Sequence, residues 1–133
     1  MNNNLTHAKV LFVEDEEQIR VFAVDAISIV TQQVVMAENG KVGLEYFCEA
    51  LKEGNQPFDI IITDLRMPMM DGKTMIEEIR KLDQKTPIII LSADNDLASN
   101  DERARLNIGG YILKPMNMMG LMNMISDLLD TKK

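Results

Sequence analysis

The chain has 133 residues, a net charge of −7 and a single cysteine, and its 46% hydrophobic and 26% charged residues are typical of one globular domain. The acidic balance argues against direct binding to nucleic acid, which requires clustered Lys and Arg, and a lone cysteine excludes an internal disulfide. Because the sequence has neither an apolar run long enough to cross a membrane nor a secretory signal, we expect a cytoplasmic protein that does not contact membranes.

The first half of the chain alternates two apolar runs with two helical patterns. Lys9–Val13 is a short apolar run that predicts a strand. Apolar residues then recur over residues 19–30 at the three- and four-residue intervals of an amphipathic helix, with Phe22 on the expected apolar face. Gln33–Ala37 predicts a second strand, and the apolar positions over residues 44–51 predict a second helix.

The second half of the chain repeats this alternation. Phe58–Thr63 and Pro87–Leu91 are apolar at consecutive positions, a pattern typical of strands that are covered on both faces of a sheet. The remaining expected elements are a helix over residues 75–79, a polar helix over Asp96–Leu106, a short strand at Tyr111–Leu113 and an amphipathic helix over residues 118–129.

Five strands that alternate with five helices predict an α/β fold with a doubly wound parallel sheet and helices on both faces. No linker rich in Pro, Gly or Ser divides the chain. We therefore expect a single domain over residues 1–133 with its core at about residues 9–130.

Polar side chains follow four of the expected strands. Glu14 and Asp15 follow the first strand, Asp64 the third, Ser92 the fourth and Lys114 the fifth. Each of these residues alone has an ordinary explanation as a helix cap, a turn residue or a solvated charge. Because the carboxyl ends of parallel strands share one edge of the sheet, we expect all five side chains to meet there. Carboxylates suit Mg²⁺, a carboxylate can accept a phosphoryl group, and a lysine can pair with its oxygens.

Four segments of the chain resemble the receiver domain of two-component response regulators. They are VLFVEDEE (10–17), FDIIITDLRMPMMDG (58–72), IIILSA (88–93) and GGYILKP (109–115), and the resemblance extends over roughly residues 9–130. It implies a single flavodoxin-like five-stranded sheet with the strand order 2-1-3-4-5. Glu14 stands where Asp is commoner in the family.

The resemblance also implies roles for the residues that bind the metal and the phosphoryl group. Asp64 is similar to the phosphoacceptor that takes a phosphoryl group from a histidine kinase and becomes 4-aspartylphosphate. Asp15 is similar to a direct Mg²⁺ ligand and Glu14 to its water-mediated neighbour, and the backbone carbonyl of Arg66 would be a further ligand. Mg²⁺ is thus the expected cofactor.

Three further residues resemble the parts that respond to phosphorylation. Ser92 is similar to the hydroxyl residue that binds the phosphoryl group, Lys114 to the lysine that pairs with it, and Tyr111 to the aromatic residue whose rotamer follows it. The output surface is then expected over Asp96 to Leu129.

The partners implied by the resemblance are a sensor histidine kinase or phosphotransfer protein and a downstream protein or effector domain, with phosphorylation-dependent dimerisation as a further form of output. The chain would assist its own phosphorylation and dephosphorylation without being an enzyme for other substrates. We also expect a cis peptide bond before Pro115 and an ion pair between Arg66 and Asp94 at the mouth of the site.

Four alternatives remain open. A Mg²⁺-dependent phosphatase of the haloacid dehalogenase type also uses an aspartate nucleophile, but it needs a second Asp at the position of Arg66. A flavodoxin-like nucleotide binder needs a loop rich in Ser, Thr and Gly where this chain has Glu14–Glu17. The third alternative is a receiver-like module that binds partners without phosphorylation, and the fourth is a receiver cut from a larger regulator.

Overall fold

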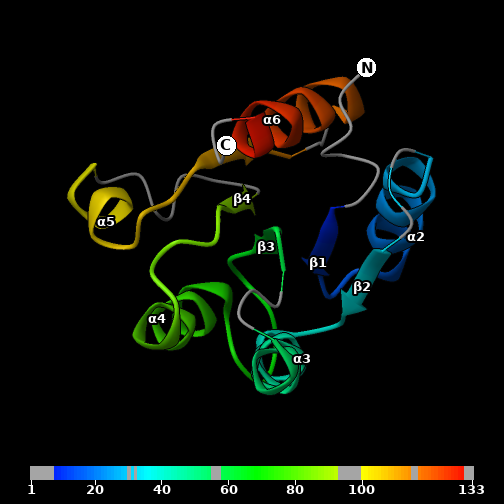
Figure 1. The fold of residues 1–133 in the computed structure, drawn as a ribbon. Coiled ribbons are helices and arrows are strands. Elements are labelled where there is room, and N and C mark those ends of the chain that lie inside the picture. The colour runs from blue at the N-terminus through cyan, green and yellow to red at the C-terminus, as the bar shows by residue number, and fades with distance from the viewer. Residues whose placement is uncertain are drawn as a thin grey trace.

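The computed structural model describes residues 8–29, 31, 33–54, 58–92, 100–114 and 117–130, and within them five strands alternate with five helices (Figure 1). In chain order the elements are β1 (Lys9–Val13), α2 (Glu17–Ile27), β2 (Gln33–Ala37), α3 (Gly40–Glu53), β3 (Ile60–Asp64), α4 (Gly72–Leu82), β4 (Ile88–Ser92), α5 (Asn100–Arg105), β5 (Gly110–Leu113) and α6 (Met118–Asp130).

The strands form one parallel sheet in the order β2-β1-β3-β4-β5, which confirms the expected fold and strand order. The register places the last residues of neighbouring strands side by side, because Asp64 pairs with Leu91 and Ser92 pairs with Leu113. The carboxyl ends of the strands therefore lie along one edge of the sheet, as the functional hypothesis requires.

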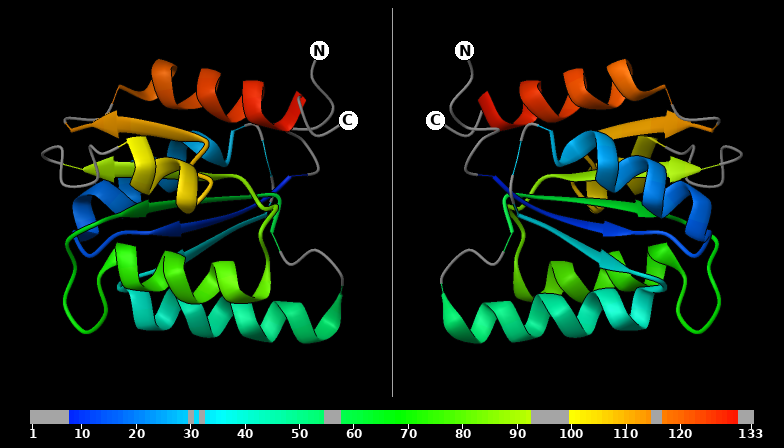
Figure 2. Two further views of the ribbon diagram at one scale, coloured as in Figure 1. Left: turned by 90° about the vertical axis from the view of Figure 1, so that its left-hand side faces the viewer. Right: turned by 90° about the vertical axis from the view of Figure 1, so that its right-hand side faces the viewer.

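Two layers of helices cover the sheet (Figure 2). The helices α3 and α4 lie side by side on one face, where Phe47, Met75 and Ile79 pack on Leu11, Ile61 and Ile90 in one buried cluster. On the other face, residues of α2 and α6 such as Ala23, Ile27 and Leu121 pack on Phe12, Ile62 and Leu91. Both faces of the central strands are thus buried, which explains why their sequences are apolar at consecutive positions.

Helices α3 and α4 each have a side-chain N-cap, which is followed by a tightly packed glycine as the first helical residue. The side chain of Asn39 accepts a hydrogen bond from the Val42 amide (2.9 Å), and the side chain of Asp71 accepts one from the Thr74 amide (2.8 Å). The amide of Gly72 donates to the Leu65 carbonyl (2.8 Å). A Cβ atom on Gly72 would lie 2.0 Å from the carbonyl oxygen of Asp64, so only glycine lets α4 start this close to the end of β3.

A buried arginine joins three parts of the fold near the opposite edge of the sheet. Arg80, near the end of α4, is only 8% exposed. Its guanidinium donates hydrogen bonds to the carbonyl oxygens of Leu106 (2.7 Å), Thr86 (2.8 Å), Asn107 (3.0 Å) and Asp83 (3.1 Å). Burial lowers the pKa of Arg80, and the charge of Asp83 opposes that shift. The residue thus ties the end of α4 to the turns before β4 and after α5.

Two sequence expectations differ from the structure, and a third can be compared with it only in part. Phe22 is 54% exposed, because the buried stripe of α2 runs through Ala23 and Ile27, and Phe22 lies beside it. The third strand begins at Ile60 and not at Phe58, although Phe58 is buried as expected and stacks on Phe47. The polar helix expected from Asp96 is described only from Asn100, and residues 93–99 lie outside the described residues.

None of the helices in the described residues is both long enough and apolar enough to cross a bilayer.

Candidate functional site

The polar residues predicted at the strand ends converge on the carboxyl edge of the sheet. Glu14 and Asp15 directly follow β1, Asp64 is the last residue of β3, and Lys114 directly follows β5. Carboxylate oxygens of Glu14, Asp15 and Asp64 all lie within 4.8 Å of one another. The sheet topology therefore brings together residues that are up to 100 positions apart in the chain, from Glu14 to Lys114.

Lys114 is the cation at the centre of this cluster. Its Nζ lies 2.8 Å from Oδ2 of Asp64, 2.9 Å from Oε1 of Glu14 and 3.7 Å from Oε1 of Glu16. Burial lowers the pKa of Lys114, but the contacts with Asp64 and Glu14 outweigh it and hold the pKa above its ordinary value. The side chain therefore stays an ammonium at neutral pH. Glu16 was not among the predicted site residues, although it belongs to the same acidic run as Glu14.

Glu14 is fully buried, and its neighbours fix its position. Its Oε2 accepts a hydrogen bond from the Glu16 amide (3.1 Å), and its carbonyl oxygen accepts one from Nη1 of Arg20 (2.8 Å). Burial raises the pKa of Glu14 to about 7, helped by the nearby charge of Asp64 and opposed by Lys114. By contrast, Asp15 is exposed on the rim of the site.

The carboxylate of Asp64 is held from both of its oxygens. Oδ1 accepts hydrogen bonds from the amides of Leu65 (2.7 Å) and Arg66 (3.4 Å), and Oδ2 faces the ammonium of Lys114. Asp64 is only 6% exposed. The amide of Arg66 is thus placed beside Asp64, while the metal contact of its carbonyl stays a prediction.

The donor set fits a hard divalent cation such as Mg²⁺. Three carboxylates supply only oxygen ligands, which is what Mg²⁺ prefers. Oε1 of Glu14 is buried and accepts no hydrogen bond of acceptable geometry from the described residues, although Lys114 lies close to it. A buried carboxylate oxygen of this kind is stabilised by a cation. The residues that could hold the metal are therefore Asp15 and Asp64, and the buried Glu14 lies next to both of them.

Ser92 and Tyr111 occupy neighbouring strands near the same edge. Ser92 is buried at the end of β4, and Tyr111 is half-buried on β5. Because Ser92 pairs with Leu113, and Tyr111 is two residues before Leu113, both side chains are on the same side of the sheet. The guanidinium carbon of Arg103 lies 4.5 Å from the centre of the Tyr111 ring. No sequence pattern linked Arg103 to Tyr111.

Two expectations at the mouth of the site cannot be compared with the structure. Asp94, the expected partner of Arg66, and Pro115, the expected site of a cis peptide bond, both lie outside the described residues.

Comparison with known proteins gives a consistent result. A family model described as "Response regulator receiver domain" matches residues 10–126. The chain is 34% identical over 126 residues to the sensor histidine kinase TmoS of Ectopseudomonas mendocina, covering 93% of this chain. It is 35% identical over 112 residues to the probable transcriptional regulator ycf27 of Guillardia theta, covering 84% of this chain. The chain spans only 12% of the first of these relatives and 41% of the second.

A solved structure supports the same comparison over nearly its whole length. The response regulator receiver domain protein of Clostridium thermocellum matches with a TM-score of 0.83 and 27% sequence identity. The match covers 95% of this chain and 97% of that one, so no large element of either fold is left without a counterpart.

Proposed function

Because the chain belongs to the response regulator receiver domain family, we propose that it is a signalling switch in which Asp64 accepts a phosphoryl group from a histidine kinase or phosphotransfer protein. The observation that carries this proposal is the arrangement around Asp64. Its carboxylate is held between two backbone amides and the ammonium of Lys114, at the edge of the sheet and next to the exposed carboxylate of Asp15. The domain would extend over residues 1–133, with its core at about residues 9–130.

In the proposed reaction an oxygen of Asp64 attacks the phosphorus of a phosphohistidine. A P–O bond to Asp64 forms while the P–N bond to the imidazole breaks, and the imidazole leaves with the electron pair and takes up a proton from solvent. A bound Mg²⁺, held by Asp15 and Asp64 with Glu14 and the Arg66 carbonyl, would neutralise charge on the transferred group. Lys114 moves its pairing from Oδ2 of Asp64 to a phosphoryl oxygen, which needs only a small displacement of its flexible stem.

The phosphoryl group would then act on Ser92 and Tyr111. Phosphorylation replaces the single negative charge of the Asp64 carboxylate with up to about two on the phosphoryl group, and it adds strong hydrogen-bond acceptors that can draw the hydroxyl of Ser92 toward them. Tyr111, on the same side of the sheet, fills the space behind it, and the surface over residues 96–129 changes shape. That surface would bind a downstream protein, an effector domain or a second copy of the chain. Relatives named as a sensor histidine kinase and as a transcriptional regulator support both kinds of partner.

Incubation with a small phosphodonor and Mg²⁺, followed by intact mass measurement, tests the proposal. We expect one phosphoryl adduct on the wild-type protein and none on Asp64→Asn. Asp127→Asn is the matched control because Asp127 is an exposed carboxylate of α6. Asp15→Asn should slow phosphorylation and weaken Mg²⁺ binding. An adduct of unchanged yield on Asp64→Asn would refute the assignment.

A further inference from the structure

Helix α5 has little apolar packing of its own. It spans only Asn100–Arg105, and its side chains at positions 101–105 are all exposed or half-buried. A helix of six residues is not stable in isolation. Leu106, directly after it, is 2% exposed and anchors its carboxyl end in the core. Within the described residues, the other contacts of α5 are made by its charged side chains.

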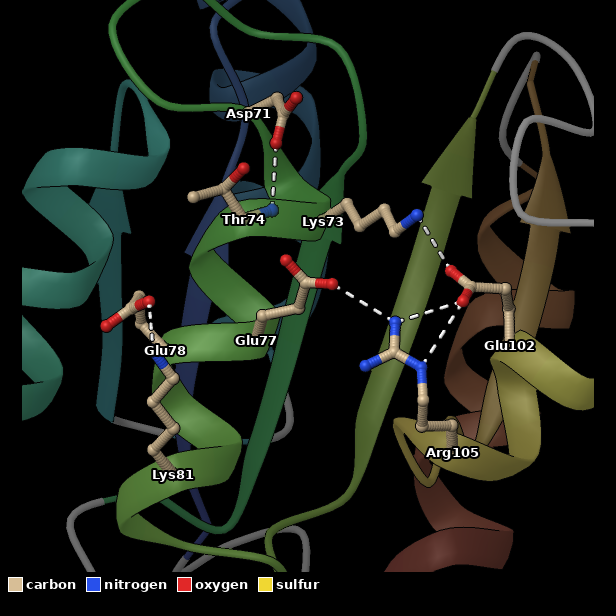
Figure 3. Close-up of polar contacts among 8 residues, drawn as sticks. All are labelled: Asp71, Lys73, Thr74, Glu77, Glu78, Lys81, Glu102 and Arg105. Atoms are coloured by element: carbon tan, nitrogen blue, oxygen red, sulfur yellow. Dashed lines mark hydrogen bonds and ion pairs between the residues drawn. The ribbon is translucent and has the colours of Figure 1, made fainter.

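One side of α5 is bound to α4 by four charged side chains, the α4–α5 charge cluster, which consists of Lys73, Glu77, Glu102 and Arg105 (Figure 3). Lys73 Nζ lies 2.8 Å from Oε2 of Glu102. Nη2 of Arg105 lies 3.0 Å from Oε1 of Glu102 and 3.1 Å from Oε2 of Glu77. Glu102 is therefore the anion that both cations share. The contact between Lys73 and Glu102 raises the pKa of Lys73 and lowers that of Glu102, so this pair stays charged around neutral pH.

The other side of α5 contacts the tyrosine of β5. Arg103 is one residue after Glu102 and is therefore turned by about 100° around the helix, while Arg105 is on the same side as Glu102. The guanidinium of Arg103 covers the ring of Tyr111 at 4.5 Å. Because both sets of contacts belong to one short helix, a movement of α5 changes the charge cluster and the contact of Arg103 with Tyr111 together.

The amino end of α4 packs directly against the phosphoacceptor residue. The amide of Gly72 donates to the carbonyl of Leu65, and the Gly72 Cα lies so close to the Asp64 carbonyl that no Cβ fits between them. Lys73 is the next residue. A displacement of the backbone at Asp64 therefore reaches Lys73 through one tight contact, and reaches Glu102 through the ion pair.

We propose that the α4–α5 charge cluster is a latch that holds α5 where Arg103 covers Tyr111, so that Glu102 and Arg103 are positioning residues for the switch. This inference rests on the proposed function, because it concerns how the state of Asp64 reaches Tyr111. Opening the latch lowers the cost of moving the Tyr111 ring. A protein without the latch therefore responds more readily to a phosphoryl group.

The test uses Glu102→Gln in a Tyr46→Phe background. The chain has two tyrosines and no tryptophan, so Tyr111 is then the only source of emission. Glu78→Gln is the matched control, because Glu78 pairs with Lys81 within α4 (2.9 Å) and does not bridge to α5. Two quantities are measured: acrylamide quenching of Tyr111 without ligand, and the affinity for beryllofluoride with Mg²⁺, a phosphoryl mimic.

We expect Glu102→Gln to raise the quenching of Tyr111 and to tighten beryllofluoride binding about two- to fivefold, the range that exposed ion pairs support. Lys73→Met should act in the same direction, and the double variant should add little to either single change, because both remove one interaction. Arg103→Gln should raise the quenching of Tyr111 while the exchange of α5 amides stays as in the wild type. Glu78→Gln should match the wild type in both measurements.

Quenching and affinity in Glu102→Gln equal to those of Glu78→Gln would overturn the latch. Weaker beryllofluoride binding would overturn it too, because it would show that the cluster supports the phosphorylated state. If Asp64→Asn binds beryllofluoride as tightly as the wild type does, or if the wild type does not bind it at all, the proposed function fails. The quenching comparison without ligand then decides by itself whether the cluster positions Tyr111.

Discussion

Replacing Gly72 with alanine tests how closely the start of α4 packs against Asp64, the proposed phosphoacceptor. The added Cβ would lie 2.0 Å from the carbonyl oxygen of Asp64 and 3.0 Å from the Cα of Leu65, and both of these atoms belong to the backbone. An ordinary contact between a carbon and an oxygen is at least about 3.3 Å. The two segments must therefore separate by about 1.3 Å, the difference between these two distances.

The cost of this separation can be worked out from the contacts that it disturbs. Overpacking in a rigid site costs about 1–3 kcal/mol, and losing the hydrogen bond from Gly72 to Leu65 costs about 0.5–1.5 kcal/mol. Alanine stabilises a helix by about 0.5–1 kcal/mol relative to glycine, which offsets part of this cost. We therefore expect Gly72→Ala to lower the free energy of unfolding by about 0.5–4 kcal/mol. A displaced Asp64 carboxylate should also slow phosphorylation by roughly 10- to 100-fold.

Urea unfolding followed by circular dichroism measures the first effect, and the rate of phosphorylation by a small phosphodonor measures the second. Gly54→Ala is the control, because Gly54 ends α3 in an extended conformation and a Cβ there meets nothing within 4 Å. It should change stability by less than about 0.5 kcal/mol. If Gly72→Ala were as stable and as readily phosphorylated as Gly54→Ala, the reasoning from this close contact would be wrong.

Two further predictions concern the turns at the other edge of the sheet. Arg80→Met should lower the unfolding free energy by about 2–4 kcal/mol, because it leaves four carbonyl oxygens without their charged donor. Lys81→Met, at an exposed neighbouring position, should have little effect on a urea unfolding curve, and equal effects of both changes would contradict the assignment. Burial raises the pKa of Asp83, but hydrogen bonds from the hydroxyl and amide of Thr86 and the amide of Lys85 outweigh it and hold the pKa below its ordinary value. Its stabilising effect is therefore complete above about pH 4 and is lost as the pH falls through the lowered pKa. Asp83→Asn should destabilise the protein at pH 7 and progressively less as the pH falls below about 4, and a loss of stability that does not change with pH over this range would exclude this explanation.

The arrangement of the strands could be predicted from the sequence because apolar runs mark buried strands directly. The bounds of β1 and β2 agree with the predicted Lys9–Val13 and Gln33–Ala37. The start of β3 could not be predicted, since Phe58 is apolar because it stacks on Phe47 and not because it lies in a strand. Apolar character reports burial, and burial alone does not define the hydrogen-bond ladder.

The meeting of the strand-end residues could also be predicted, because the parallel topology forces it. The exposure of each carboxylate could not, since it depends on how the chain turns after β1. That turn buries Glu14 and leaves Asp15 exposed. The binding of Arg80 to carbonyl oxygens, and the pairing of Lys73 with Glu102, join segments far apart in the chain and leave no periodic pattern.

The contacts of Arg80 also define how α5 can move. Because Nε and Nη2 of Arg80 bind the carbonyls of Leu106 and Asn107, the carboxyl end of α5 is a fixed pivot. The helix is a lever of six residues, about 9 Å long. A rotation of 10° about this pivot moves its amino end by about 1.6 Å and its carboxyl end hardly at all. Glu102 and Arg103 lie further from this pivot than Arg105 does, so they travel further for the same angle, and their contacts with Lys73 and Tyr111 lengthen before those of Arg80 do.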